Sequence, residues 1–301
     1  NAPQGTRGIS LFVVPKILVN SEGELEQRND LRVVSLEHKL GHMASPTAVM
    51  SYGDNEGAIG YLLGDENQGM ACMFTMMNNA RLNVAVQGLA VAERAYQRAV
   101  QWARERIQGN DISGQSTDKV AIIRHPDVRR MLMDMRSQVE AIRALCYSVA
   151  EALDLANGHP DEAIREQSRG YLDLVTPIAK AWSTDQGFEI ASIGIQVHGG
   201  MGYIEETGAA QYLRDARITM IYEGTNGIQA LDLIRRKLPR EIAATEKLFE
   251  EMQETLRHLT KHSDPFLVAT GQQFGPAIAA LEKATEWMRG TISTNLAAAA
   301  S

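Results

Sequence analysis

The sequence predicts a mainly α-helical protein in which a partial β domain precedes an antiparallel helix bundle, with an extra helical extension at the C-terminal end. Three observations predict this fold class. Short runs rich in β-branched residues occur before Gly69, helical periodicity dominates afterwards, and Pro or Gly clusters divide the periodic part into helices. We therefore expect a partial β domain at 1–70, a helix bundle at 71–237 and the extension at 238–301.

The first 70 residues are expected to form three or four strands. GISLFVVPK ends at Pro15, and the NSEG segment at 20–23 is a turn signal. RVVSLEHKLG and AIGYLLG are expected to be further strands, with SYGDNEG (51–57) between elements. So few strands would leave open sheet edges.

The clearest helix follows His125-Pro126, which is expected to open it, and NGHP (157–160) is expected to close it. Its apolar residues alternate in steps of four and three, the pattern of a long helix packed lengthwise in a bundle. These residues are Val128, Leu132, Met135, Val139, Ile142, Cys146, Val149 and Leu153. An earlier helix from Arg81 has one apolar stripe, formed by Leu82, Ala85, Leu89, Ala92, Tyr96 and Ala99.

Further helices are expected toward the C-terminal end. Pro177 lies inside the stretch from Asp161 to Val197, so a kink or a break into two helices is expected there. The remaining helices are predicted at 209–213, 228–237, 242–262 and 276–288, with a break at 263–265.

Bulk properties exclude several classes of protein. A net charge of -7 does not favour nucleic acid or an anionic membrane surface. The two cysteines, Cys72 and Cys146, have no metal-ligand spacing and form no disulfide framework, so no metal site is predicted and a reducing cytoplasm is expected. No apolar run approaches the roughly 20 residues that span a bilayer.

Two segments contain residues that helix packing alone does not explain. In Gln196–Tyr203, the glycines Gly199, Gly200 and Gly202 would let a backbone approach a phosphate closely, although a tight inter-helix turn is the more common reason for such glycines. His198 by itself is more often a hydrogen-bonded structural histidine than a ligand or base.

In Ile221–Gln229, Glu223 lies among apolar and aromatic residues, just before a helix that Thr225 or Asn226 can cap. Such a carboxylate can act as a base in a dry pocket, and a capping carboxylate on a surface loop is the alternative.

Together these segments read QVHGGMGYIEE…QYLRDARITMIYEGTNGIQ, which resembles the C-terminal signature of the acyl-CoA dehydrogenase family. MNNARLNVAVQGLAVAERAYQRAVQWARERIQG resembles the first bundle helix of that family. EHKLGHMASPT and AIGYLLGDENQGM resemble the end of its middle β domain. The resemblance covers about residues 5–237.

The resemblance implies an FAD-dependent reaction that oxidises an acyl-CoA thioester to its trans-2-enoyl form. A glutamate removes the Cα proton, and the flavin accepts hydride from Cβ. The matched glutamate is Glu223; some relatives place the base on the first bundle helix, where this chain has Ala80. The resemblance also implies an electron-transfer flavoprotein as electron acceptor and a homodimer or homotetramer.

Substrate contacts are implied for Arg81, at the CoA portion, and for the Gly224 backbone, near the thioester. Arginines on helix faces are more often solvated or in weak surface pairs, so this alternative stands for Arg81 and Arg106. Cofactor contacts, some of them across a subunit interface, are implied for Arg106, Gln196, Gly199, Gly200, Thr225, Asn226 and Gly227.

The sequence departs from the family pattern in places. IQGN after Arg106 lacks the usual Phe-Gly, and His125-Pro126 replaces His-Gln, which puts part of the cross-subunit flavin contact in doubt. The N-terminal helical domain and the first half of the β domain have no counterpart, so we expect a fragment. The residues after Lys237 resemble the extension of bacterial members, some of which act on long-chain or 3-methylthiopropionyl-type thioesters.

Two alternative functions remain beside that of a dehydrogenase. An acyl-CoA oxidase would share the proton and hydride steps but pass the electrons to oxygen. A non-catalytic helical fragment would use the bundle only to oligomerise.

Overall fold

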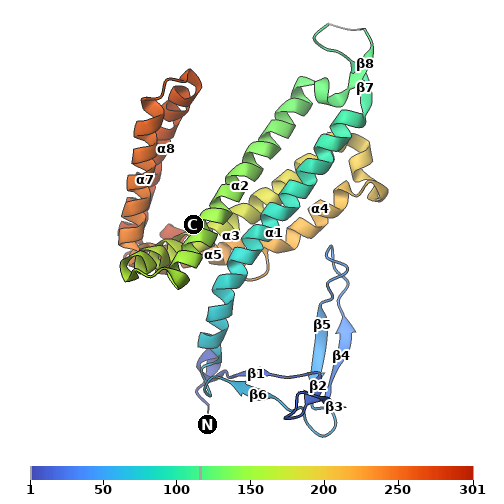
Figure 1. Cartoon of the computed structure of the whole chain (residues 1–301), viewed down its shortest axis with the longest axis vertical. Coiled ribbons are helices and arrows are strands. Elements are labelled where there is room, and N and C mark those ends of the chain that lie inside the picture. The colour runs from blue at the N-terminus through green and yellow to red at the C-terminus, as the bar shows by residue number, and fades with distance from the viewer. Residues whose placement is uncertain (1, 115–116, 301) are drawn as a thin grey trace. The chain divides into compact units, whose positions relative to one another are not determined.

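A helix bundle and a set of two-stranded β-ladders form separate parts of this chain in the computed structural model, which describes residues 2–114 and 117–300 (Figure 1). The chain divides into two compact units, residues 1–80 and 81–301, and each is described by itself.

Strands of the first unit pair as antiparallel two-stranded ladders, β1 with β6, β2 with β3 and β4 with β5. The predicted NSEG turn is confirmed, because the Asn20 side chain accepts hydrogen bonds from the backbone N–H groups of Glu22 and Glu24. Ser51 and Tyr52 belong to a strand, so their assignment to a connection was wrong. The bounds are β1 Leu11–Val13, β2 Ile17–Val19, β3 Leu25–Arg28, β4 Leu31–Leu36, β5 Ala48–Tyr52 and β6 Tyr61–Leu63.

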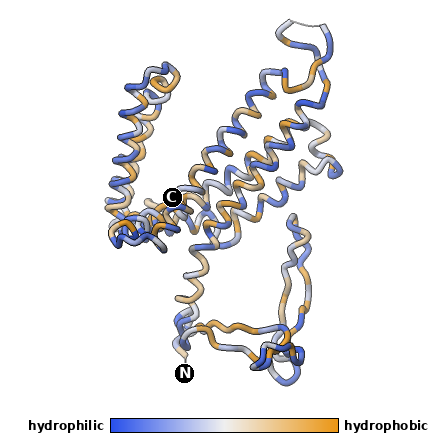
Figure 2. The backbone as a smooth tube through the Cα atoms, in the orientation of Figure 1, coloured by the Kyte–Doolittle hydropathy of each residue, from blue (hydrophilic) through white to orange (hydrophobic). Residues whose placement is uncertain are grey.

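Three long helices build the bundle: α1 Gly69–Glu105, α2 Pro126–Gly158 and α3 Glu162–His198. The helical pattern starts at Gly69 and α2 opens at Pro126, as predicted. The predicted stripe of α2 faces the core and contributes Leu132, Met135, Val139, Ile142, Cys146 and Val149 to it. Figure 2 shows hydrophilic and hydrophobic segments alternating along these helices, as a stripe on one face requires.

Helix α3 continues through Pro177 as one element, so the predicted alternative of two helices was wrong. A proline inside a helix costs about 3 kcal/mol or more. Here the residues on both sides of Pro177 are buried in the core, among them Val175 and Ala179, so packing outweighs that cost.

Helix α1 approaches α3 closely at two glycines. A Cβ on Gly88 would lie 2.6 Å from the Ser183 carbonyl oxygen, and a Cβ on Gly187 would lie 2.8 Å from the Gly88 carbonyl oxygen. Only residues without a side chain permit this backbone contact.

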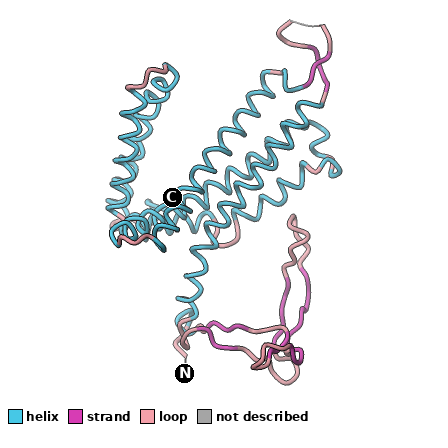
Figure 3. Tube along the Cα trace, in the orientation of Figure 1, coloured by secondary structure: helices cyan, strands magenta, loops and turns pink. Residues whose placement is uncertain are grey.

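Shorter elements follow α3 and return along it; helix α4 and the turn η5 both contact α3. Figure 3 shows that the rest of this unit is almost wholly helical. The bounds are η3 Gly199–Tyr203, η4 Glu205–Thr207, α4 Ala209–Ala216, η5 Arg217–Met220, α5 Asn226–Asp232, the π-helical turn η6 Leu233–Lys237 and α6 Leu238–Arg240.

The C-terminal extension is a helical hairpin of α7 (Ile242–Thr260) and α8 (Pro265–Ile292), followed by α9 (Leu296–Ala300). The break at 263–265 is confirmed, but α8 begins at once rather than at 276 because the Asp264 side chain caps it, accepting from Phe266 N at 2.8 Å. A hairpin that the sequence did not predict, β7 (Ile107–Asn110) with β8 (Lys119–Ala121), leads through η2 (Ile122–Arg124) into α2. Within the residues described, no helix has the length and apolar character needed to span a bilayer.

Candidate active site

Glu223 lies in a turn with a strained backbone. Its φ angle is 52°, in the left-handed region that a residue with a Cβ rarely adopts, and Gly224 after it has φ 89°. A left-handed residue other than glycine costs roughly 1–2 kcal/mol, so the surrounding contacts must hold the turn in this shape. Glu223 is half-buried. Strain retained at a carboxylate is typical of functional sites.

The Asn226 side chain fastens this turn to helix α3. Its Nδ2 donates to Asp185 Oδ1 at 2.7 Å, to Thr184 Oγ1 at 3.0 Å and to the Ala181 carbonyl at 3.2 Å. Its Oδ1 accepts from Lys180 Nζ at 2.8 Å. All the polar atoms of this amide are thus used inside the chain, and what Asn226 can still offer a ligand is its backbone.

Thr225 occupies the N-cap position of α5, but among the residues described its side chain makes no capping hydrogen bond. Asn226, the other predicted cap, directs its amide toward α3 instead. The expectation of a side-chain cap was therefore wrong, because tertiary hydrogen bonds hold this helix start.

Lys180 is fully buried beneath the turn. Burial lowers the pKa of Lys180 to about 8, with Arg81 acting in the same direction, while the Asp185 and Glu223 carboxylates oppose the shift. The ammonium group is therefore charged at neutral pH and close enough to Glu223 to feel its charge.

Arg81 is also buried, and its Nη1 donates to Asp232 Oδ2 at 3.0 Å. Asp232 also accepts from Arg236 Nε at 2.5 Å. Within the described part of the chain, the buried Nε of Arg81 has no hydrogen-bond partner. Arg81 is thus anchored through Nη1, and its guanidinium keeps further N–H donors, the buried Nε among them.

Two further hydrogen bonds fix the turn on either side of Glu223. Gln229 Nε2 donates to the Gly224 carbonyl at 3.1 Å, and Tyr222 Oη donates to Gln87 Oε1 on α1. A side chain at Gly224 would be strained by its φ of 89°, and its Cβ would lie 2.6 Å from Gln229 Nε2 and displace that amide. Burial raises the pKa of Tyr222, which keeps the phenol neutral beside Glu223.

The glycine segment lies at the C-terminal end of α3. Gln196, Gly199 and Gly200 are exposed, and a Cβ on Gly199 or Gly200 would meet nothing within 4 Å. Gly202, in contrast, is buried, and a Cβ there would lie 2.4 Å from the Ile195 carbonyl oxygen, so packing explains this glycine.

His198 has the structural role that its isolated position indicated. Its Nδ1 lies 2.7 Å from the Gly194 carbonyl, and its ring stacks on Trp102 of α1 with centroids 5.1 Å apart. Burial lowers the pKa of His198. The backbone N–H of Arg106 donates to the Trp102 carbonyl, so Arg106 lies at the same end of the bundle, where it is exposed.

The residues predicted for one site therefore form two groups. Lys180 and His198 are 18 residues apart on α3, or about 27 Å at 1.5 Å per residue. The first group contains Glu223, Arg81, Gly224, Thr225, Asn226 and Gly227, and the second contains Arg106, Gln196, Gly199 and Gly200. A ligand that contacts both groups must be long or must lie between two subunits.

Sequence reasoning missed Lys180, Asp232 and Gln229, all of which are buried near Glu223. A signal existed for Lys180, because a lone charge stands in the apolar run VTPIAKAW. Asp232 and Gln229 continue the signature segment and carried no separate signal.

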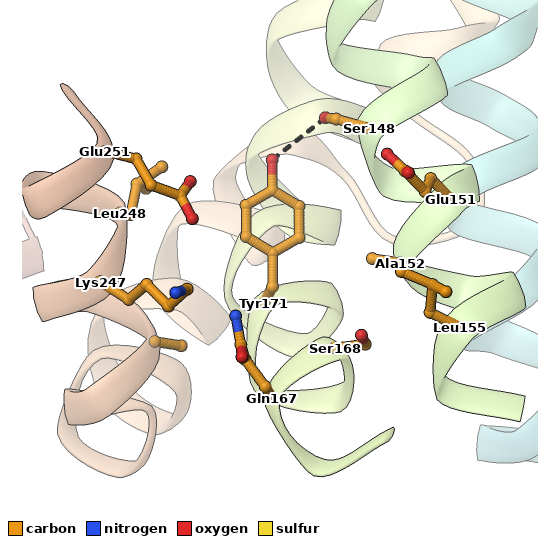
Figure 4. Close-up of a pocket in the computed structure, with 11 residues that line it drawn as sticks. Ser148, Glu151, Ala152, Leu155, Gln167, Ser168, Tyr171, Lys247, Leu248 and Glu251 are labelled. Carbon is orange, nitrogen blue, oxygen red and sulfur yellow. Dashed lines mark hydrogen bonds between the residues drawn. The ribbon is translucent and has the colours of Figure 1, made fainter. Parts of the chain in front are cut away.

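A separate cleft of about 290 Å³ lies among α2, α3 and α7 (Figure 4). Tyr171 stands in its centre, with Oη 3.0 Å from Ser148 Oγ, and Lys247 and Glu251 of α7 face it. None of the residues predicted for the site lines it.

Comparison with known proteins gives a family match. Residues 67–238 match the family described as acyl-CoA dehydrogenase, C-terminal domain. The chain is 54% identical to the 3-methylmercaptopropionyl-CoA dehydrogenase of Ruegeria pomeroyi, over 84% of this chain and 42% of the relative. It is 38% identical to a butyryl-CoA dehydrogenase of Syntrophomonas wolfei, over 79% of this chain and 40% of the relative. The chain thus spans less than half the length of these relatives.

Solved structures show the same fold. Caenorhabditis elegans ACDH-11, crystallised in complex with C11-CoA, superposes with a TM-score of 0.80 and 26% identity, covering 98% of this chain and 46% of that chain. Butyryl-CoA dehydrogenase from Megasphaera elsdenii gives a TM-score of 0.59 at 26% identity, over 76% of this chain and 52% of the other.

Proposed function

Since this chain belongs to the acyl-CoA dehydrogenase family, we propose that the whole protein oxidises an acyl-CoA thioester to its trans-2-enoyl form, with Glu223 as the base. The observation that carries this proposal is the turn at Glu223. A carboxylate in a left-handed conformation is held there by the Asn226 amide and by Gln229. Among the predicted site residues, Glu223 is the one whose side chain can accept a proton.

The chemistry at Glu223 needs a fixed carboxylate beside an acidified C–H bond. The thioester carbonyl acidifies the Cα proton, and the ionised Glu223 removes it once the substrate is positioned. Arg81 is proposed to bind the CoA portion, with Asp232 holding its guanidinium in place. The Gly224 backbone is proposed to contact the thioester.

FAD fits the residues of both groups. Gly199, Gly200 and Gly227 border open space, so a dinucleotide can approach their backbone closely. Arg106 and Gln196, both exposed, are proposed to contact the same cofactor, and Thr225 and Asn226 to border it through their backbone. When bound, the flavin supplies the acceptor for the Cβ hydride.

The separation of the two groups supports a site shared by two subunits, so we propose a homodimer or homotetramer. An electron-transfer flavoprotein is the proposed electron acceptor, and oxygen is the alternative. Cys72 and Cys146 are free thiols, and we keep the reducing cytoplasm as the proposed compartment.

A short thioether acyl-CoA is the proposed substrate class, because the relative with 54% identity is named for 3-methylmercaptopropionyl-CoA. The test is anaerobic bleaching of the flavin absorption of the whole protein by this thioester, butyryl-CoA and a long-chain acyl-CoA. We expect the thioether to bleach fastest. A Glu223→Gln variant should keep its flavin and lose most of the bleaching. Near-normal bleaching by that variant would overturn the proposal, and peroxide formation under air would favour the oxidase.

A further inference from the structure

Lys180 is a charged side chain in the interior whose burial the fold alone does not require. It is fully buried on α3, in an apolar run, and it is the largest of the fully buried side chains. Burying an ammonium group costs several kcal/mol unless partners compensate. A hydrophobic residue of similar length would fill the same space, so packing alone does not explain why a charged residue occupies this position.

The partner of Lys180 is the turn that carries Glu223. Lys180 Nζ donates to Asn226 Oδ1 at 2.8 Å, and Asn226 follows Glu223 by three positions. The same amide is bound on its other side by Thr184 and Asp185. Lys180 therefore completes a set of hydrogen bonds that leaves Asn226 one orientation.

Charges on the neighbouring elements converge on this lysine. They are Arg81 of α1, Asp185 of α3, Glu223 of the turn and, through its pair with Arg81, Asp232 of α5. Tyr222, the remaining titratable group beside Glu223, is neutral. Asp232 is shared by Arg81 and Arg236, and the carboxylates that act on Lys180 are Asp185 and Glu223.

We propose that Lys180 is a positioning residue for Glu223: its buried ammonium group holds Asn226, and so the strained turn, against α3. This inference rests on the proposed role of Glu223 as the base. Lys180 acts through Asn226 and does not itself remove a proton.

The test compares kcat and KM of the whole protein and of the variants Lys180→Met, Lys180→Arg and Lys237→Met. Methionine keeps the length without the charge, and arginine keeps the charge. Lys237 is a matched control, because it is a part-buried lysine that pairs with Asp173 of α3 at 2.7 Å and, within the residues described, makes no hydrogen bond with Asn226.

For Lys180→Met we expect kcat to fall about tenfold or more, with KM changed by less than about threefold. Lys180→Arg should restore much of the lost kcat, and Lys237→Met should keep the kcat of the wild type. A kcat of Lys180→Met within about twofold of the wild type would overturn the positioning role.

Glu223→Gln in the same series separates the two proposals. An inactive Glu223→Gln with an unchanged kcat for Lys180→Met overturns the positioning role alone, whereas an active Glu223→Gln overturns the proposed function as well. If Lys180→Met does not fold, Asn226→Ala replaces it. With flavin content checked by absorbance, we expect kcat to fall about tenfold at nearly constant KM, and an unchanged kcat would refute the inference.

Discussion

The Arg81 guanidinium joins helix α1 to Asp232 of α5, with Nη1 3.0 Å from Oδ2, across 151 residues of sequence. The two side chains are only 7% and 2% exposed. Breaking a buried pair by removing one partner leaves a charge without compensation, which costs about 3–5 kcal/mol. We therefore expect Asp232→Asn to lower the free energy of unfolding by about 3 kcal/mol, measured by urea denaturation.

The control for this prediction is Asp173→Asn. Asp173 pairs with Lys237 at 2.7 Å, but its side chain is 36% exposed. Because solvent screens such pairs, the loss should stay below about 1 kcal/mol. Equal losses in the two variants would show that burial does not set the strength of the Arg81–Asp232 pair.

The close approach of α1 and α3 predicts intolerance of any side chain at Gly88. A Cβ there would lie 2.6 Å from a backbone oxygen of Ser183, which cannot move without shifting α3. We expect Gly88→Ala to destabilise the protein by about 1–3 kcal/mol, seen as a lower Tm. Gly290→Ala, in helix α8 with open space around it, should instead raise Tm, by about 0.5–1 kcal/mol in stability. A stable Gly88→Ala variant would contradict the helix contact.

The lowered pKa of Lys180 predicts how the free energy of unfolding depends on pH. Its pKa is lowered from 10.5 to about 8 in the folded protein by burial, so between these values the unfolded chain holds a proton that the folded chain has released. Stability must therefore rise with pH across this window and be lower below pH 8. The stability of the wild type relative to Lys180→Met should increase by roughly 3 kcal/mol from pH 7.5 to pH 10.5, in urea unfolding at each pH. A constant difference would mean that the pKa is not depressed.

The two cysteines should differ in reactivity. Cys146 is 1% exposed in the bundle core, and burial raises its pKa, whereas Cys72 is half-buried in the other unit. Since the thiolate is the reactive form, iodoacetamide should label Cys72 in the native protein and Cys146 only after unfolding. Peptide mass spectrometry after labelling reads both sites, and early labelling of Cys146 would contradict the packing of α2.

The sequence by itself determined the helix pattern and the family. The alternating apolar stripe of α2, the start of α1 at Gly69 and the signature around Glu223 are local patterns, and local patterns report helix faces and family membership. It also indicated that His198 is structural. It could not determine the continuity of α3 through Pro177 or the early start of α8, because packing and an aspartate cap decide those limits.

Only the tertiary structure decided which residues lie together. Lys180 is distant from Glu223 in sequence, and Asp232 belongs to no motif of its own. Both are nevertheless buried beside the turn that holds Glu223. The structure also showed that Gly199 and Gly200 lie at the C-terminal end of α3, whereas the turn of Glu223 packs on the middle of that helix. One continuous signature in the sequence contains all three residues. The physical reason is that hydrogen bonds and charges act through space, while sequence patterns record only the neighbours of each residue along the chain.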